Sequence, residues 1–165
     1  MPFGSGGHGD ARLRFPTRTR IATFHRREDS LGRDDVVETT FPVRYAESDQ
    51  MGIVHHASYV IWMEEGRTQY LRAKGLGYEQ VERAGTFLAV TEVNVRYIAP
   101  ARYGDSVTVR TWIDDLRSRT VTFGYEIVNA GSHATLVTGQ VKLIWIDRQG
   151  RVIKMPESVR AVVQS

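Results

Sequence analysis

Apolar and polar residues alternate along most of the second half of the chain. The alternation falls in four runs, at residues 93–97, 107–113, 121–127 and 137–145. A period of two places successive side chains on opposite faces of an extended segment, so each run predicts a strand. Segments rich in Gly, Asn, Asp and Ser separate the runs, which indicates short turns between consecutive strands.

From His56 to about Lys74 the period changes to that of a helix. Large or apolar residues recur every three or four positions on one face (Tyr59, Trp62, Met63, Gly66, Tyr70 and Leu71). Gly75 then supplies a helix stop. Gly66 lies in mid-helix, where glycine costs roughly 1 kcal/mol relative to alanine. We interpret it as a place where a sheet approaches the helix closely.

An extended segment precedes the helix, from Val37 to Tyr45, and Pro42 within it indicates an edge strand or a bulge. One strand, one long helix and then at least four sequential strands make an α+β order. The helix can bury its apolar face only against the concave side of a curved antiparallel sheet. We therefore expect one domain over residues 37–165, built as such a sheet wrapped around one long central helix.

Residues 1–36 show no sustained periodicity, and we predict a disordered basic extension. Six arginines and no acid lie between Arg12 and Arg27, so this segment holds much of the net charge of +3. A basic excess placed in a tail argues against a nucleic-acid-binding domain, and no nucleic-acid partner is expected.

Composition narrows the class further. A length of 165 residues suits one domain, and the hydrophobic and charged fractions of 41% and 25% are ordinary for a globular protein. The chain has no cysteine, which excludes thiol catalysis and Cys-ligated metals. No stretch approaches the roughly 20 apolar residues of a membrane span, and the first residues lack the apolar run of a secretory signal. A cytoplasmic protein is expected.

The chemistry-bearing residues gather between Arg44 and Ile61, where the extended segment gives way to the helix. This segment contains an acid, a histidine pair and a tyrosine (Asp49, His55, His56 and Tyr45). A helix start offers free backbone N–H groups and the positive end of the macrodipole, which stabilise an anion or a polarised carbonyl oxygen. A carboxylate beside it can activate water or attack a carbonyl carbon. The arrangement is typical of acyl transfer.

Three motifs carry a resemblance to a known family over roughly residues 39–160. They are Y-A-E-S-D-Q-M-G-I-V-H-H-A-S-Y from Tyr45, Glu64-Glu-Gly-Arg67, and the segment 95–105. In this order and spacing they resemble the hot-dog-fold acyl-CoA thioesterases of the 4-hydroxybenzoyl-CoA type, including the bacterial branch associated with the Tol–Pal envelope system. The resemblance implies hydrolysis of an acyl-CoA thioester without a cofactor, the hot-dog fold, and a homo-oligomer, either dimer or tetramer.

The resemblance also implies roles for individual residues. Asp49 becomes the catalytic carboxylate, with Tyr45 and His56 beside it in the pocket and the backbone N–H near His56 polarising the thioester carbonyl. Further substrate-binding positions are implied, with the arginines contacting CoA phosphates (His55, Tyr59, Arg117 and Arg119). His55 departs from the aromatic residue of many relatives. A weak membrane or Tol–Pal association is implied as well.

Other readings remain open or fail on the residues. An Asp before a helix is commonly an N-cap, but Asp49 lies some seven residues before the helix becomes regular. Adjacent His55 and His56 point about 100° apart in a helix, and no metal site is expected. The chain has no Gly-x-Ser-x-Gly elbow for a serine hydrolase. A hot-dog enoyl-CoA hydratase would need Asp-x-Asn-Pro-x-His, and Val54 stands where its His belongs. A non-catalytic acyl-CoA-binding protein stays possible.

Overall fold

The computed structural model describes residues 35–77, 81–82 and 85–163. Its elements follow one another along the chain as a short strand, a 3₁₀ turn, a long helix, four strands and a terminal helix. They are β1 (Val37–Pro42), η1 (Tyr45–Glu47), α1 (His56–Ala73), β2 (Thr86–Tyr97), β3 (Ser106–Leu116), β4 (Thr120–Asn129), β5 (Thr135–Asp147) and α3 (Glu157–Val163). The predicted α+β order is confirmed.

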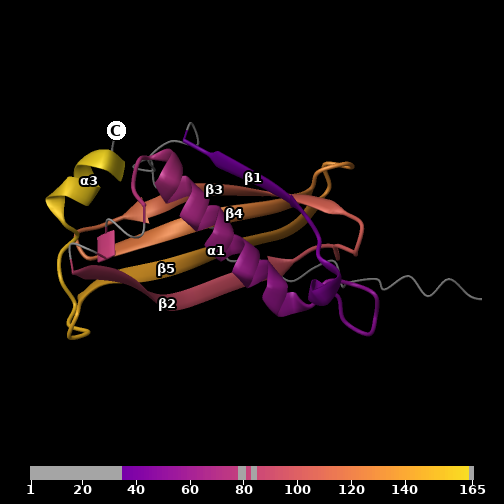
Figure 1. The fold of residues 1–165 in the computed structure, drawn as a ribbon, viewed down its shortest axis with the longest axis horizontal. Helices are drawn as coiled ribbons and strands as arrows, with labels where there is room; N and C mark the ends of the chain where they lie inside the picture. The colour runs from indigo at the N-terminus through magenta and orange to yellow at the C-terminus, as the bar shows by residue number, and fades with distance from the viewer. Residues whose placement is uncertain (1–34, 78–80, 83–84, 164–165) are drawn as a thin grey trace, which may run out of the picture.

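The strands form one antiparallel sheet in the order β1-β3-β4-β5-β2. Helix α1 lies diagonally across one face of this sheet, from the end of β2 toward the start of β1 (Figure 1). The two edges are β1, which ends at Pro42, and β2, which is 12 residues long. A proline at the end of an edge strand costs no ladder hydrogen bond, so the sequence prediction for Pro42 is confirmed.

The face of α1 that packs on the sheet is the predicted apolar stripe, and its residues are almost fully buried (Tyr59, Trp62, Met63, Tyr70 and Leu71). At Gly66 the helix comes so close that an added Cβ would lie 2.5 Å from Oγ1 of Thr111 and 2.8 Å from Cγ1 of Val109. The sheet therefore requires glycine here, as the pattern predicted. Arg67 shares this face and is only 7% exposed, because it lies one helical turn after Met63.

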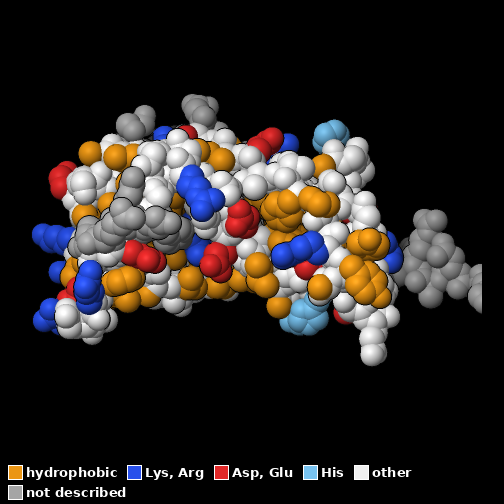
Figure 2. Space-filling model, in the orientation of Figure 1, with side chains coloured by type: hydrophobic (Ala, Val, Ile, Leu, Met, Phe, Trp, Pro, Cys, Tyr) orange, Lys and Arg blue, Asp and Glu red, His pale blue; other side chains and the backbone are white. Residues whose placement is uncertain are grey.

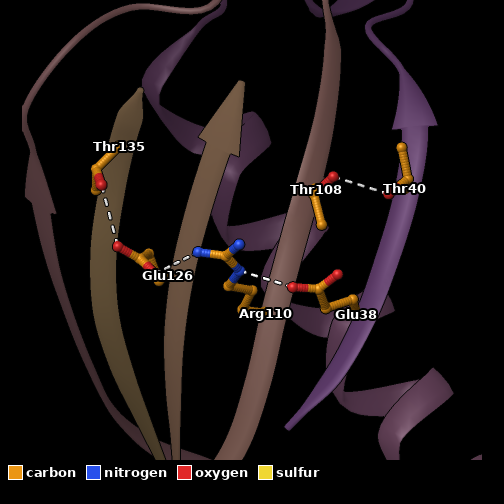
Figure 3. A network of polar contacts seen from close by, with 6 residues as sticks. All are labelled: Glu38, Thr40, Thr108, Arg110, Glu126 and Thr135. Atoms are coloured by element: carbon orange, nitrogen blue, oxygen red, sulfur yellow. Dashed lines mark hydrogen bonds and ion pairs between the residues drawn. The ribbon is translucent and has the colours of Figure 1, made fainter. Parts of the chain in front are cut away.

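The opposite face of the sheet is polar. Figure 3 shows Arg110 of β3 between two acids, with Nε 2.8 Å from Glu38 of β1 and Nη1 3.1 Å from Glu126 of β4. Glu126 also accepts a hydrogen bond from the Thr135 hydroxyl, 3.0 Å away. Alternation along β3 thus sends Val109 and Thr111 toward the helix and Arg110 toward solvent. One face of the sheet therefore directs polar side chains toward solvent, and the other face packs against α1, as expected of a two-layer fold.

Three features lie outside the sequence predictions. Strand β2 begins at Thr86, seven residues before the alternation becomes clear at Val93. Tyr45 belongs to η1, because β1 ends at Pro42. The chain end forms α3, which buries Val159 and Val163 against the sheet end. Among the helices that the structure describes, none is long and apolar enough to cross a membrane.

The start of the described chain is tied to α1. The carboxylate of Asp35 accepts a 2.7 Å hydrogen bond from the Tyr70 hydroxyl and lies 2.8 Å from the Lys74 ammonium. Burial by itself raises the pKa of Asp35, but these two partners outweigh it and lower the pKa below the ordinary value. Residues 1–34, the larger part of the predicted basic extension, lie outside the described residues.

Candidate active site

Asp49 lies in a tight loop of residues 48–54 that joins η1 to the start of α1. The loop is closed by a bridge between Ser48 and Val54 and by a 2.8 Å hydrogen bond from the Asp49 amide to the Ile53 carbonyl. Gly52 turns the chain with a φ of 70°, and its amide donates to the Asp49 carbonyl. A short closed loop of this kind holds its side chains in a defined position.

The Asp49 side chain closes a turn within the loop. Its Oδ1 accepts a 2.8 Å hydrogen bond from the Met51 amide, two residues on. This is the local bond of an Asx turn and leaves the second carboxylate oxygen available. Asp49 therefore does not cap α1, and that alternative reading is excluded by the geometry.

His55 is the residue that caps the helix. Its Nδ1 accepts the Ala57 amide at 3.2 Å, and its carbonyl accepts the Ser58 amide at 2.9 Å. Its own amide donates to the Glu47 carbonyl at 2.8 Å. Among the described residues, the His56 amide has no backbone or side-chain acceptor. One helix-start N–H of the described residues is thus unpaired, and it is the amide to which the resemblance assigns the thioester carbonyl; its role in binding a ligand oxygen stays a prediction.

Aromatic residues surround this helix start. The side chain of Tyr45 is 78% exposed and meets the Tyr103 ring edge to face at 5.5 Å. The rings of His55 and His56 lie 4.2 Å apart, both on exposed residues. Figure 2 shows apolar side chains gathered at the end of the molecule that carries η1 and the start of α1. Tyr45 and the two histidines therefore border the loop from the solvent side.

Tyr59 occupies a different environment from the other predicted site residues. It is only 2% exposed, and its hydroxyl accepts the Ala101 amide at 2.8 Å. Burial raises its pKa above the ordinary value, so it stays neutral. Its ring packs on Trp62 and on Tyr97. Within this chain Tyr59 fixes the segment after β2 against the helix and offers little surface to a ligand.

Arg117 and Arg119 lie at the other end of the sheet. Asp105, just before β3, accepts a hydrogen bond from the Val43 amide at the end of the sheet where the Asp49 loop lies. The two arginines instead follow the last residue of β3. Eleven strand residues at about 3.3 Å each separate the two ends by roughly 35 Å. Both arginines are exposed, and Arg117 pairs with Asp115 at 2.8 Å. One chain does not bring them to Asp49.

A groove of about 540 Å³ lies between β1 and the outward side of α1. Its walls are Phe41, Pro42, Arg44, Glu47, Ile61, Trp62, Glu64, Glu65 and Thr68. None of the predicted catalytic residues lines it, so it is separate from the loop and the free amide. Within the described part of the chain, no three His, Asp or Glu side chains are grouped to hold a metal ion.

Sequence reasoning missed two residues of this region. Glu47, two positions before Asp49, is buried beneath the loop, and Tyr97 donates a 2.9 Å hydrogen bond to the His56 carbonyl. Both lie inside the quoted motifs, but only contacts 15 or more residues apart in sequence reveal what they do. Periodicity carries no such signal.

A sheet wrapped on one helix, with a carboxylate on the loop that precedes the helix and an unpaired amide at the helix start, is the architecture of a hot-dog acyl-thioester enzyme. The sequence matches the thioesterase-like superfamily over residues 43–163, and the chain belongs to this family.

Individual relatives and structures agree with this assignment. The chain is 42% identical to YneP of Bacillus subtilis over 94 residues. This match covers 57% of this chain and 68% of YneP. The chain is 33% identical over 109 residues to the acyl-CoA thioester hydrolase YbgC of Escherichia coli, covering 65% of this chain and 81% of YbgC. A DHNA-CoA thioesterase from Staphylococcus aureus superposes with a TM-score of 0.73 at 29% identity, covering 78% and 91% of the two chains. The hot-dog fold is confirmed.

Proposed function

We propose that this protein is an acyl-CoA thioesterase that releases a free acid and CoA. The observation that carries the proposal is the unpaired His56 amide at a helix start, next to the closed loop that holds Asp49. Family membership supports thioester hydrolysis as the reaction. The names of the E. coli and S. aureus relatives support a CoA thioester as the substrate.

The proposed reaction begins with the thioester carbonyl oxygen on the His56 N–H. The hydrogen bond and the helix dipole stabilise the negative charge that develops on this oxygen, and one such donor is worth roughly 3–4 kcal/mol in other acyl-transfer enzymes. The carbonyl carbon then becomes the electrophile. No metal or cofactor is needed, because a thioester is already activated.

Asp49 supplies the second half of the reaction by one of two routes. As a general base it takes a proton from water, the hydroxide attacks the carbonyl carbon, and CoA leaves as the thiolate. As a nucleophile it attacks the carbonyl carbon, CoA leaves as the thiolate, and water hydrolyses the resulting mixed anhydride to the free acid and the regenerated Asp49 carboxylate. Its free carboxylate oxygen is available for either route. Tyr45 and the imidazole of His56 border the reacting groups and position the acyl part.

A homodimer would complete the substrate site. Strand β2 is an unpaired edge with exposed Val90 and Val93, and such edges invite pairing. Its last residue, Tyr97, lies at the site end, whereas its first residue, Thr86, lies with β4's start at the other end. Antiparallel pairing of two β2 edges about a two-fold axis would bring turn 117–119 of the partner subunit toward Asp49. Arg117 and Arg119 could then bind CoA phosphates.

The test of the proposed function is release of free CoA from a panel of short, long and aromatic acyl-CoA thioesters. Steady turnover that disappears in Asp49→Asn is the expected result. Binding of acyl-CoA without release of CoA would instead identify a non-catalytic binding protein. Light scattering on the same sample should show a dimer or a tetramer, and a fully active monomer would contradict the shared site.

We further propose a cytoplasmic location with weak attraction to an anionic membrane surface or to Tol–Pal components. The support is the resemblance to the Tol–Pal-associated branch and the six arginines between Arg12 and Arg27. Cell fractionation at low and high salt tests this, because salt screens electrostatic attraction between arginines and an anionic surface.

A further inference from the structure

Glu47 is a buried carboxylate that the proposed reaction does not use. Glu47 is 8% exposed and accepts hydrogen bonds from the Arg44 amide at 2.8 Å and from Arg44 Nε and Nη2 at 3.1 and 2.7 Å. Oε1 also accepts the indole N–H of Trp62 at 2.9 Å, a bond buried beneath the loop. A buried charge is costly unless it is fully bonded, and this one is.

The carboxylate is held in its ionised form. Burial by itself raises the pKa of Glu47, but the hydrogen bonds from Arg44 and Trp62 outweigh it and lower the pKa below the ordinary value. Glu47 therefore remains a strong acceptor at neutral pH.

The position of Glu47 connects these bonds to the site. The loop of residues 48–54 leaves the chain directly after Glu47 and returns to it at His55, whose amide donates to the Glu47 carbonyl. The side chain of Glu47 also accepts a hydrogen bond from the indole of Trp62, about two turns into α1. One residue thus holds the start of the loop, the end of the loop and the body of the helix.

Thioester hydrolysis requires this kind of connection, because the Asp49 carboxylate and the His56 amide must act on the same thioester carbonyl. Asp49 lies on the loop and the His56 amide lies on the helix, so their separation depends on how the loop is fastened to the helix. A misplacement of about 1 Å can cost on the order of 10²-fold in rate.

We propose that Glu47 is a positioning residue, which holds the Asp49 loop in register with the His56 amide through its bonds to Trp62, Arg44 and His55. The inference rests on the proposed function of Asp49 and adds to it. It assigns Glu47 no contact with substrate. Loosening the bonds of Glu47 should therefore slow the chemical step and leave substrate affinity nearly intact.

The experiment compares Glu47→Gln and Trp62→Phe with the control Glu64→Gln in the full-length protein. Glu64 lines the same groove as Glu47 but is exposed, and its carboxylate makes no hydrogen bond or ion pair with the described residues. Gln at 47 keeps the size and loses the charge, whereas Phe at 62 removes only the indole donor and some bulk. The readouts are kcat and KM for the best substrate, together with thermal unfolding.

We expect kcat to fall about 10-fold or more in both variants, with KM within about threefold of wild type. The double variant should be no slower than the slower single variant, because both changes break one connection. Glu64→Gln should match the wild type. A kcat equal to that of the control in folded Glu47→Gln and Trp62→Phe, with only a lower Tm, would overturn the proposal.

Two further outcomes separate the positioning role of Glu47 from the catalytic role of Asp49. If Glu47→Gln does not fold, Trp62→Phe alone decides, since it leaves the Arg44 bonds in place. The proposed function is measured separately by Asp49→Asn. If Asp49→Asn is inactive and Trp62→Phe is fully active, only the positioning role of Glu47 is contradicted. If Asp49→Asn is fully active, the catalytic mechanism on which that role rests is contradicted.

Discussion

The hydroxyl of Tyr97, the last residue of β2, donates a 2.9 Å hydrogen bond to the carbonyl of His56, the first residue of α1. The bond joins the sheet edge to the residue whose amide is unpaired. Tyr97 therefore fixes the height of the helix start above the sheet, and its ring supports Tyr59 from the side.

Tyr97→Phe tests this connection. The ring contact stays and one hydrogen bond is lost, which should cost about 1 kcal/mol of unfolding free energy. Chemical denaturation measures this cost, and kcat should fall by less than about 10-fold, since Glu47 still fastens the loop. A loss as large as that of Asp49→Asn would mean that Tyr97 takes part in the chemistry.

Asp49→Asn should remove most turnover and keep the fold. An asparagine Oδ1 can still accept the Met51 amide, so the turn in the loop survives, but an amide is neither a base nor a nucleophile. The expected loss in kcat is at least about 10²-fold. Steady-state kinetics beside an unchanged unfolding curve would check this. Retention of most of the wild-type kcat would contradict both catalytic routes.

Removing the guanidinium groups of Arg117 and Arg119 tests the shared substrate site. The double variant Arg117→Ala/Arg119→Ala should raise KM for CoA thioesters and leave kcat nearly unchanged, because these groups would bind CoA phosphates and not the reacting carbonyl. The wild-type KM should rise with salt and the variant's should not. Arg72→Ala, which removes an exposed arginine from the last turn of α1, is the control. An unchanged KM would remove these residues from the site.

Gly66→Ala should destabilise the protein although alanine favours helices. The new Cβ would overlap Thr111 and Val109, and overpacking of this kind costs typically 1–3 kcal/mol, against a gain of about 1 kcal/mol in helix propensity. Gly77→Ala, where a Cβ meets no atom within 4 Å, should stay near wild type. The free energy of unfolding in urea distinguishes the two. A Gly66→Ala protein more stable than the wild type would show that the sheet can move away from α1 to accommodate the added Cβ.

Truncation separates the two parts of the N-terminal segment. A chain beginning at Asp35 should keep full kcat, because the predicted catalytic cluster, α1 and the five described strands all lie downstream. A chain beginning at Val37 loses the carboxylate that binds Tyr70 and Lys74 and should unfold at a lower temperature. Loss of kcat in the Asp35 truncation would place residues before Asp35 in the working domain.

The same carboxylate predicts a pH dependence. Its pKa is lower in the folded state, so its stabilising contribution is present above the ordinary pKa of about 4 and is lost as the pH falls through the folded value. Acid should therefore destabilise the chain from Asp35 more than the chain from Val37. Unfolding temperatures of the two truncations at pH 7 and pH 3 measure the difference, and a constant gap would contradict it.

The sequence by itself determined the elements and much of the site. A period of two and a period of three to four are local properties, so four strands, α1 and its buried face could be predicted from residues close in sequence. Gly66 was understood from its cost in a helix alone. The motif around Asp49 placed the proposed catalytic acid seven residues before the helix-start amide of His56.

Only the tertiary structure decided what depends on residues far apart in sequence. The strand order, the hydrogen bond between the Ala101 amide and the Tyr59 hydroxyl and the bond between Tyr97 and His56 join segments that no local period links. The cap on α1 fell to His55, because its backbone is held by Glu47 across the loop. The same closure left the His56 amide unpaired. The sequence pattern identified the residues of this segment, but only the hydrogen bonds across the fold show that, among the described residues, the His56 amide at the helix start is unpaired.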